Sequence, residues 1–391
     1  MHRHEFPIFK KHPELIYLDS AATTHKPACV IEAISKFYAE DYATVHRSIY
    51  RSSLTATDQY NETREAARRF LNAANVEEIV FTRGTTESIN LVALSYGRTH
   101  LRPGDEIFVF ELEHHSNLVP WQMLAKQTGA TLRWMPMKPD GTADFSGLSP
   151  HTKIVAIAHV SNITGVIHPI AEMANAAHKV GAVLVVDGAQ AAPHLPIDVQ
   201  ALDCDFYAFS GHKCYGPTGV GILYGKKELL LSMPPLEGGG DMIATVTLEQ
   251  TTYALPPLRF EAGTPNIASV IALKSALEFI EKRDLLSYEK KLLAQLEAGL
   301  CTVPGLRILG SPPQRGPLVT FTIDRVHPLD LATLLDVQQI AIRTGHLCAQ
   351  PALRKFHLDS AARASLGAYN TSLDIERFID ALKRSLPKLQ Q

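Results

Sequence analysis

The 391-residue sequence has no excess of charge of one sign and no long apolar run. It contains 38 Lys and Arg against 40 Asp and Glu, a formal net charge of −2. Such a balance gives no general attraction to nucleic acids or to acidic membrane surfaces. No apolar stretch approaches the roughly 20 residues that a bilayer-spanning helix needs, and residues 2–7 lack the apolar core of a secretory signal. We therefore expect a cytoplasmic protein that binds neither nucleic acid nor membranes.

Cysteine is scarce as well, and its five positions are scattered without a Cys-x-x-Cys pair: Cys29, Cys204, Cys214, Cys301 and Cys348. This pattern argues against a disulfide framework and against a zinc finger, and we expect no metal site. The composition, 46% hydrophobic and 20% charged, is that of an ordinary globular chain. Its length suggests two or three domain-sized units.

Short apolar runs alternate with amphipathic stretches between about residues 76 and 224. Their composition is apolar and β-branched on both faces, which is typical of strands that are covered on both sides. The βαβ rhythm predicts a large three-layer α/β/α domain with a mainly parallel sheet. We expect its strands at residues 78–82, 106–110, 131–135, 154–159, 183–187, 206–209 and 220–224.

The pattern changes after Gly263, where we expect a smaller α+β domain. A long helical region is predicted from about residue 268 to 300, followed by strands at 319–323, 340–343 and 364–368 and a helix after Pro328. The last helix should begin at the capping box of Thr371 and Asp374. We predict a large domain over residues 15–265 and a small domain over residues 266–391, with residues 1–14 attached to the small one.

Polar residues directly after these strands are the best candidates for a site, because open α/β sheets bind ligands at the carboxyl ends of their strands. Residues 83–88, Arg-Gly-Thr-Thr-Glu-Ser, offer hydroxyls and free N–H groups that suit a phosphate, although an ordinary helix cap explains them equally well. His114 and His115 should diverge and not share a zinc ion. One ring could face a planar cofactor or move a proton, and a plain surface pair is the alternative.

Three further residues suggest covalent chemistry. Asp187 follows four apolar residues and needs a cationic partner if buried, such as a protonated ring nitrogen; a helix cap is the alternative. Lys213 lies in a Gly- and Pro-rich loop where desolvation would favour a Schiff-base lysine. Cys348, close in sequence to Arg343 and His346, is a candidate nucleophile, although an inert cysteine is the simpler interpretation of this segment alone.

In this order the segments closely resemble the SUF-type (group II) cysteine desulfurases, which belong to the fold-type I pyridoxal-phosphate (PLP) enzymes. This branch includes selenocysteine lyase and cysteine sulfinate desulfinase relatives. The short loop Arg-Thr-Gly-x-x-Cys-Ala-Gln-Pro at residues 343–351 looks like that branch, although Leu347 stands where the motif often has histidine. The resemblance runs from residue 17 to residue 366, in segments 17–23, 83–90, 113–121, 161–165, 187–190, 210–219, 260–266, 343–351 and 363–366.

The resemblance implies a role for each residue. Lys213 would bond PLP and move protons, His114 would stack on its ring, Asp187 would pair with the ring nitrogen, and Gln190 would contact the phenolate oxygen. Thr264 would reach the phosphate bound by a partner subunit, which implies a homodimer. The full set comprises catalytic Cys348, Lys213 and His114; cofactor-binding Lys213, Thr85, Thr86, His114, Asp187, Gln190, Ser210, His212 and Thr264; and substrate-binding Asn162, Arg363, Arg343 and Ala21.

The implied activity converts L-cysteine to L-alanine and leaves a persulfide on Cys348. That sulfur would pass to a SUF-type acceptor protein for iron–sulfur cluster assembly. A selenocysteine lyase or cysteine sulfinate desulfinase is the close alternative, and there Cys348 would matter less. An inactive PLP-fold subunit acting as a scaffold is an alternative of a different class.

Overall fold

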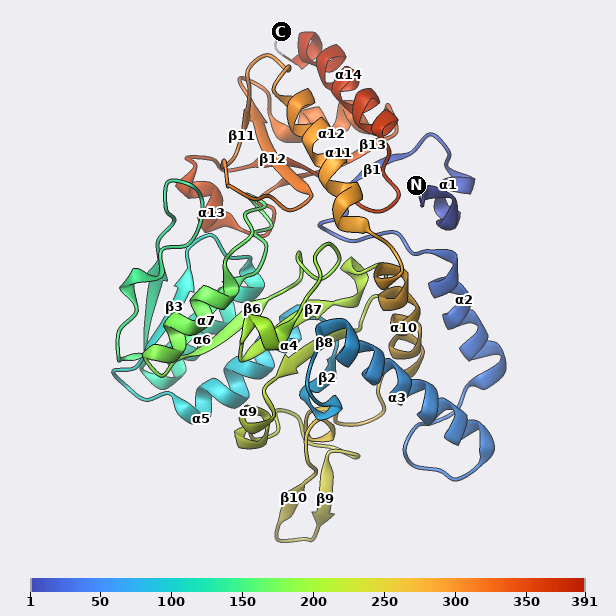
Figure 1. The fold of residues 1–391 in the computed structure, drawn as a ribbon, viewed down its shortest axis with the longest axis vertical. Coiled ribbons are helices and arrows are strands. Elements are labelled where there is room, and N and C mark those ends of the chain that lie inside the picture. The colour runs from blue at the N-terminus through green and yellow to red at the C-terminus, as the bar shows by residue number, and fades with distance from the viewer. Residues whose placement is uncertain (1, 390–391) are drawn as a thin grey trace.

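A seven-stranded sheet lies at the centre of the larger part of the chain (Figure 1). The computed structural model describes residues 2–389, so positions 1, 390 and 391 of the predicted domains lie outside the described residues. The strand order is β2-β8-β7-β6-β5-β3-β4. β8 is antiparallel to both of its neighbours and the other pairs are parallel. The strands are β2 (Ile79–Thr82), β3 (Glu106–Phe110), β4 (Thr131–Met135), β5 (Thr152–Ala158), β6 (Val183–Asp187), β7 (Phe206–Ser210) and β8 (Gly221–Gly225).

Helices cover both faces of this sheet, because alternate strand residues point to opposite sides. Along β2, Ile79 and Phe81 join one apolar core while Val80 joins the other. The predicted three-layer fold with a mainly parallel sheet is therefore confirmed. The first face carries α2 (Ala28–Lys36), α3 (Arg51–Leu71), α7 (Ile170–Lys179), α8 (Val199–Leu202) and α10 (Ile267–Glu281), and the second carries α4 (Thr85–Leu91), α6 (Val119–Thr128) and α9 (Lys227–Ser232).

A five-stranded sheet forms the core of the smaller part of the molecule, in the order β1-β13-β14-β12-β11. Its apolar core includes residues of three helices, α11 (Leu285–Leu300), α12 (Pro328–Asp336) and α14 (Ser372–Leu389). The predicted capping box holds, since Thr371 Oγ1 accepts from the Asp374 N–H at 3.1 Å and an Asp374 carboxylate oxygen accepts from the Thr371 N–H at 3.0 Å. The strands are β1 (Ile16–Leu18), β11 (Leu306–Ile308), β12 (Leu318–Ile323), β13 (Ile340–Gly345) and β14 (Ala361–Ser365).

The division into a large domain (residues 15–265) and a small domain (266–391) stays a prediction. Two elements pack with the part of the molecule on the other side of that division. β1 pairs in parallel with β13 and so extends the smaller sheet. α10 packs against α2 and α3 and contributes to the core of the larger part. The short helices α1 (Pro7–Lys11), α5 (Arg98–His100) and α13 (Gln350–Lys355) complete the set of α-helices within residues 2–389.

Three details differ from the sequence-based expectation. The long helical region predicted over residues 268–300 is divided into two helices: α10 ends at Glu281, and the Asp284 side chain caps the start of α11 by accepting from the Ser287 N–H. The strand expected at 364–368 lies three residues earlier, as β14. An unexpected hairpin of β9 (Ile243–Val246) and β10 (Thr251–Tyr253) projects from the end of the molecule opposite α14 (Figure 1).

An aromatic cluster joins the N-terminal segment to both parts of the molecule. Phe6 is fully buried, and its ring centroid lies 4.9 Å from that of Tyr369, 5.5 Å from that of Phe279 and 5.9 Å from that of Tyr215. Offset and edge-on contacts of this kind stabilise aromatic pairs beyond the burial of their area.

Within residues 2–389, no helix combines the length and the apolar character needed to span a bilayer.

Candidate active site

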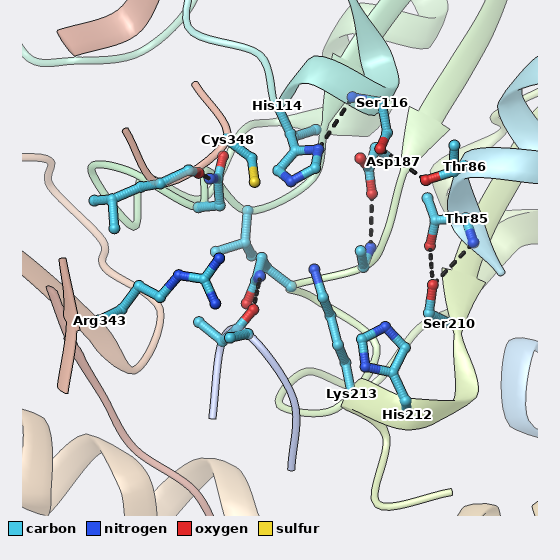
Figure 2. A pocket seen from close by; sticks show the side chains of 18 of the residues that line it. Thr85, Thr86, His114, Ser116, Asp187, Ser210, His212, Lys213, Arg343 and Cys348 are labelled. Carbon is cyan, nitrogen blue, oxygen red and sulfur yellow. Dashed lines mark hydrogen bonds between the residues drawn. The ribbon is translucent and has the colours of Figure 1, made fainter. Parts of the chain in front are cut away.

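All of the predicted site residues except Thr264 line one cavity of about 220 Å³ (Figure 2). Strand ends of both sheets supply them, because α4, the turn at 115–117 and the turn at 211–213 follow β2, β3 and β7, while β13 and β14 supply two arginines. Thr264 is exposed and lies outside the cavity. The predicted residues that line it are Ala21, Thr85, Thr86, His114, Asn162, Asp187, Gln190, Ser210, His212, Lys213, Arg343, Cys348 and Arg363.

Hydroxyl groups gather at one end of the cavity. Ser210 Oγ lies 2.8 Å from Thr85 Oγ1 and accepts from the Thr85 N–H at 2.9 Å, while Thr86 Oγ1 lies 2.7 Å from Ser116 Oγ. Gly84, with φ of +150°, allows this close approach, since a Cβ there would lie 3.1 Å from Ser210 Oγ. Donors of this kind at the start of a helix suit a phosphate group.

Asp187, which is buried, and Lys213, which is partly buried, lie in the middle of the cavity. Burial raises the pKa of Asp187, which the charge of Lys213 and the Ala189 N–H oppose. Burial lowers the pKa of Lys213, and Asp187 opposes that shift. Within residues 2–389, Asp187 forms no ion pair and the Lys213 amine forms no hydrogen bond. A buried carboxylate of this kind would be stabilised by a cationic ligand group.

His114 is a neutral ring in this cavity. Burial, followed by the charge of Lys213, lowers the pKa of His114 to about 3. Its Nδ1 accepts from the Ser116 N–H at 3.1 Å, which assigns the ring proton to Nε2. Glu113 fixes the loop that carries this ring, accepting from the Ala158 N–H at 2.7 Å and from Asn117 at 2.8 Å. Figure 2 shows His114, Lys213 and Cys348 pointing toward the same space.

Two arginines share one carboxylate at the opposite end of the cavity. Arg343 and Arg363 face each other across β13 and β14, and Asp19 lies 4.0 Å from the first and 3.4 Å from the second. Burial lowers the pKa of Arg363, but an arginine stays charged in proteins. Its Nε is buried and has no hydrogen-bond partner among residues 2–389. This end of the cavity therefore has an excess of positive charge, which suits a carboxylate.

The cysteine turn, residues 345–349, is held in a rare backbone conformation. Leu347 and Cys348 have φ values of +52° and +56°, each costing about 1–2 kcal/mol for an L-residue. Two carbonyls secure it: Leu347 O accepts from Asn162 Nδ2 at 2.8 Å, and Cys348 O accepts from the His115 N–H at 2.8 Å. Leu347 is buried in the main apolar core, so an apolar residue at this position anchors the turn.

Four contributing residues received no assigned role from the sequence: Asp19, Glu113, His115 and Ser116. His115 links the cysteine turn to the sheet a second time, because its Nε2 accepts from the Gln350 N–H at 3.1 Å. Asp19 follows β1 directly, in a segment already noted for its resemblance, so its position after a strand was the available signal. Glu113 and Ser116 flank the histidine pair but carried no pattern of their own.

The donor set fits PLP together with an amino acid. Hydroxyls at one end match a phosphate, the buried Asp187 matches a protonated ring nitrogen, Lys213 supplies an amine, and the arginine pair matches a substrate carboxylate. The thiol of Cys348 lines the same cavity. Within residues 2–389, no group of His, Cys, Asp and Glu side chains is arranged to hold a metal ion.

Comparison with known proteins agrees with this geometry. Residues 16–378 match the family model described as Aminotransferase class-V. The chain is 48% identical to a cysteine desulfurase of Escherichia coli O127:H6, covering 98% of this chain and 97% of that protein. It is 49% identical to a probable cysteine desulfurase of Halalkalibacterium halodurans, and the match covers 100% of this chain and 98% of that protein.

Solved structures give the same result. The S-sulfonic acid form of the Escherichia coli cysteine desulfurase CsdA superposes with a TM-score of 0.93 at 43% identity, over 99% of this chain and 98% of that one. The apo cysteine desulfurase of Thermococcus onnurineus NA1 superposes with a TM-score of 0.94 at 38% identity, over the same shares. The chain belongs to the aminotransferase class-V family and, within it, to the cysteine desulfurases.

Proposed function

We propose that the protein is a PLP-dependent cysteine desulfurase that converts L-cysteine to L-alanine and leaves a persulfide on Cys348. The observation that carries this proposal is the meeting of Lys213, Asp187 and Cys348 in one cavity with a positively charged end. An aminotransferase has no need for a thiol on a strained, doubly secured turn.

The residues that would hold PLP follow from the donor set. Thr85, Thr86, Ser210 and His212 would hold the phosphate, and His114 would lie against the ring. Asp187 would keep the ring nitrogen protonated, and Gln190, whose amide already donates to Ala21 O at 2.8 Å, would face the phenolate oxygen. When bound, PLP supplies an electron sink for the charge that develops at the substrate α-carbon.

The arginine pair would orient the substrate. Arg363 would bind the substrate carboxylate. Asp19 and the Asn162 carbonyl hold its two terminal nitrogens, and its Nε has no partner in the described part of the chain. Arg343, which is half-exposed at the mouth of the cavity, would add a second contact. Lys213, whose amine loses its proton more readily than an exposed lysine, would carry the α-proton.

Cys348 would complete the reaction. Its sulfur forms a bond with the substrate sulfur as the substrate C–S bond breaks, and the carbon gains the proton that makes alanine. L-cysteine and the enzyme thiol thus become L-alanine and an enzyme persulfide, with atoms and electrons balanced. Cys348 is only partly buried, so a second molecule can reach the sulfur.

We further propose that the protein belongs to the SUF-type branch and passes this sulfur to a SUF-type acceptor protein for iron–sulfur cluster assembly in the cytoplasm. The short connection between β13 and α13, residues 346–349, supports the branch. We also propose a homodimer in which Thr264 reaches the partner subunit. Exposed apolar side chains near α2 and α3 support the dimer: Tyr38, Tyr42, Ile49, Tyr50 and Leu54. A mass in solution of twice the 43.0 kDa of one chain would confirm it.

The test compares wild type with Cys348→Ala, using Cys301→Ala as the control at an exposed cysteine outside the cavity. PLP-loaded protein is given L-cysteine without reductant, and alanine and the added sulfur mass are measured. We expect wild type and C301A to form one alanine and one persulfide per active site, and C348A to form neither.

Equal alanine release by wild type and C348A would contradict the desulfurase assignment. If C348A retained activity on selenocysteine or cysteine sulfinate, a lyase or desulfinase would describe the protein better. An inactive scaffold subunit would show no absorbance change on mixing with PLP, in wild type or in either variant.

A further inference from the structure

A segment just after β1 is bonded to the peptide group that precedes Lys213. The His212 carbonyl oxygen accepts from the Thr24 N–H at 3.1 Å, Thr24 Oγ1 at 3.0 Å, Thr23 Oγ1 at 3.2 Å and Lys26 Nζ at 2.9 Å. A carbonyl oxygen has two lone pairs, so this one has more donors than it can bond ideally. Such crowding marks a carbonyl whose position is strongly fixed.

That carbonyl belongs to the peptide bond that joins His212 to Lys213. Because a peptide group is planar and rigid, fixing its oxygen also fixes the nitrogen of Lys213. Thr24 secures the turn a second time, since its Oγ1 accepts from the Tyr215 N–H at 2.9 Å. The backbone on both sides of Lys213 is therefore bonded to Thr24.

The Lys213 side chain depends on this backbone contact for its position. Within the described part of the chain its amine forms no hydrogen bond, so no side-chain partner fixes the end of this flexible four-carbon stem. By contrast, Lys26 donates both to His212 O and, at 2.6 Å, to Thr24 O.

Packing alone does not explain why the charged amine of Lys26 is partly buried, because removing a charge from water is unfavourable. Burial lowers its pKa to about 8, and the nearby Cys214 only partly opposes the shift. Among residues 2–389 it forms no ion pair, so the two carbonyl contacts are what stabilise its charge. Hydrogen bonds from a charged donor are roughly twice as strong as neutral ones.

We propose that Thr24 and Lys26 form a positioning clamp on the His212 carbonyl, which sets where the Lys213 amine lies in the cavity. Neither residue lines the cavity, so both act through Lys213. The proposal rests on the proposed function only in requiring that Lys213 takes up PLP.

The test measures PLP capture at Lys213 and does not depend on desulfuration. Cofactor-free protein is mixed with PLP, samples are reduced with borohydride over time, and the labelled fraction of Lys213 is measured by peptide mass spectrometry. We expect Lys26→Met to slow labelling about tenfold, the loss expected from one charge-assisted hydrogen bond. Lys26→Arg, which keeps the charge and the donors, should recover part of the rate.

Lys10→Met is the matched control, because Lys10 is exposed on α1, and it should label at the wild-type rate. An independent comparison uses Thr24→Val, which removes the hydroxyl, and Thr24→Ser, which keeps it. If K26M does not fold, the labelling rates of these two variants test the clamp. Wild-type labelling rates in both K26M and T24V would overturn the clamp. No labelling of Lys213 in wild type would instead overturn the proposed function, and the clamp with it.

Discussion

The reactivity of Lys213 depends on the charges around its amine. Burial lowers the pKa of this lysine, the Asp187 carboxylate opposes the shift, and the charge of Arg363 reinforces it. Because the neutral amine is the form that attacks a carbonyl carbon, a lower pKa raises the reactive fraction at neutral pH. Asp187 therefore has an effect on the cofactor-free enzyme that is separate from its role toward a ring nitrogen.

We predict that Asp187→Asn lowers the pH at which Lys213 becomes half-reactive. The sign follows from charge: a neighbouring carboxylate favours the protonated amine and raises the pKa of Lys213, so its removal lowers that pKa further. The measurement is reductive methylation of cofactor-free protein with formaldehyde across pH, read at Lys213 by mass spectrometry. Asp58→Asn, on an exposed face of α3, should leave the profile unchanged. An unchanged or higher midpoint in D187N would contradict the prediction.

At the scale of elements, two strand ends meet unusually closely at the hydroxyl end of the cavity. Gly221 begins β8 and faces Gly84, the residue before α4. A Cβ on Gly221 would lie 2.5 Å from Gly84 Cα, 2.9 Å from Gly84 N and 2.7 Å from Phe209 O. These are backbone atoms, so a larger residue would have to move the turn that carries Thr85.

We predict that Gly221→Ala weakens PLP binding at least tenfold and destabilises the fold by about 1–3 kcal/mol, the usual range for an overpacked site. Fluorescence titration with PLP and urea unfolding measure the two effects. Gly238→Ala is the control, because a Cβ there meets no atom within 4 Å and the residue is exposed. If G221A bound PLP with wild-type affinity, the turn that carries Thr85 could move without weakening PLP binding, which would contradict the prediction.

The sequence was informative where an element is defined by its own residues. Each strand of the larger sheet was placed within about two residues, because an apolar run bounded by turn residues marks it locally. Candidate residues after several strands line one cavity, because polar residues at the carboxyl ends of parallel strands converge. The family resemblance, and not this rule, gave Ala21, Asn162, Gln190 and Arg363. The break before Asp284 was missed, because the apolar periodicity continues on both sides of it and hides the cap.

Long-range contacts explain the site residues that were missed. His115 acts through the Cys348 carbonyl and the Gln350 N–H, and Asp19 acts through arginines of β13 and β14. No local pattern encodes a partner so distant along the chain. The β9–β10 hairpin was missed for a different reason: its side chains are mostly exposed, so no alternation of apolar residues marks it.

At the scale of the whole molecule, the aromatic cluster around Phe6 connects three distant segments. Tyr215 comes from the loop beside Lys213, Phe279 from α10, and Tyr369 from the segment after β14. Phe9 packs beside Phe6 in the same cluster. The N-terminal segment thus contributes to the stability of both sheets.

We predict that Phe6→Ala lowers the free energy of unfolding by about 3–5 kcal/mol, as expected for removing a fully buried aromatic ring. Phe6→Leu should cost clearly less, because it keeps most of the apolar volume. Urea unfolding followed by circular dichroism measures both, with Leu373→Ala as the control at a side chain that is 59% exposed. A loss below about 1 kcal/mol in F6A would contradict a joining role for the cluster.

The parallel pairing of β1 with β13 also has a consequence for biosynthesis. Ile16 pairs with Ile340, so β1 bonds to a strand that is synthesised more than 300 residues after it. At about 5–20 residues per second, its partner emerges only after tens of seconds. Until then β1 must stay unpaired on the nascent chain, together with the segment after it that bonds to His212. The smaller sheet and the arginine end of the candidate site can thus be completed only after β13 and β14 have been synthesised, which delays activity until both strands are present.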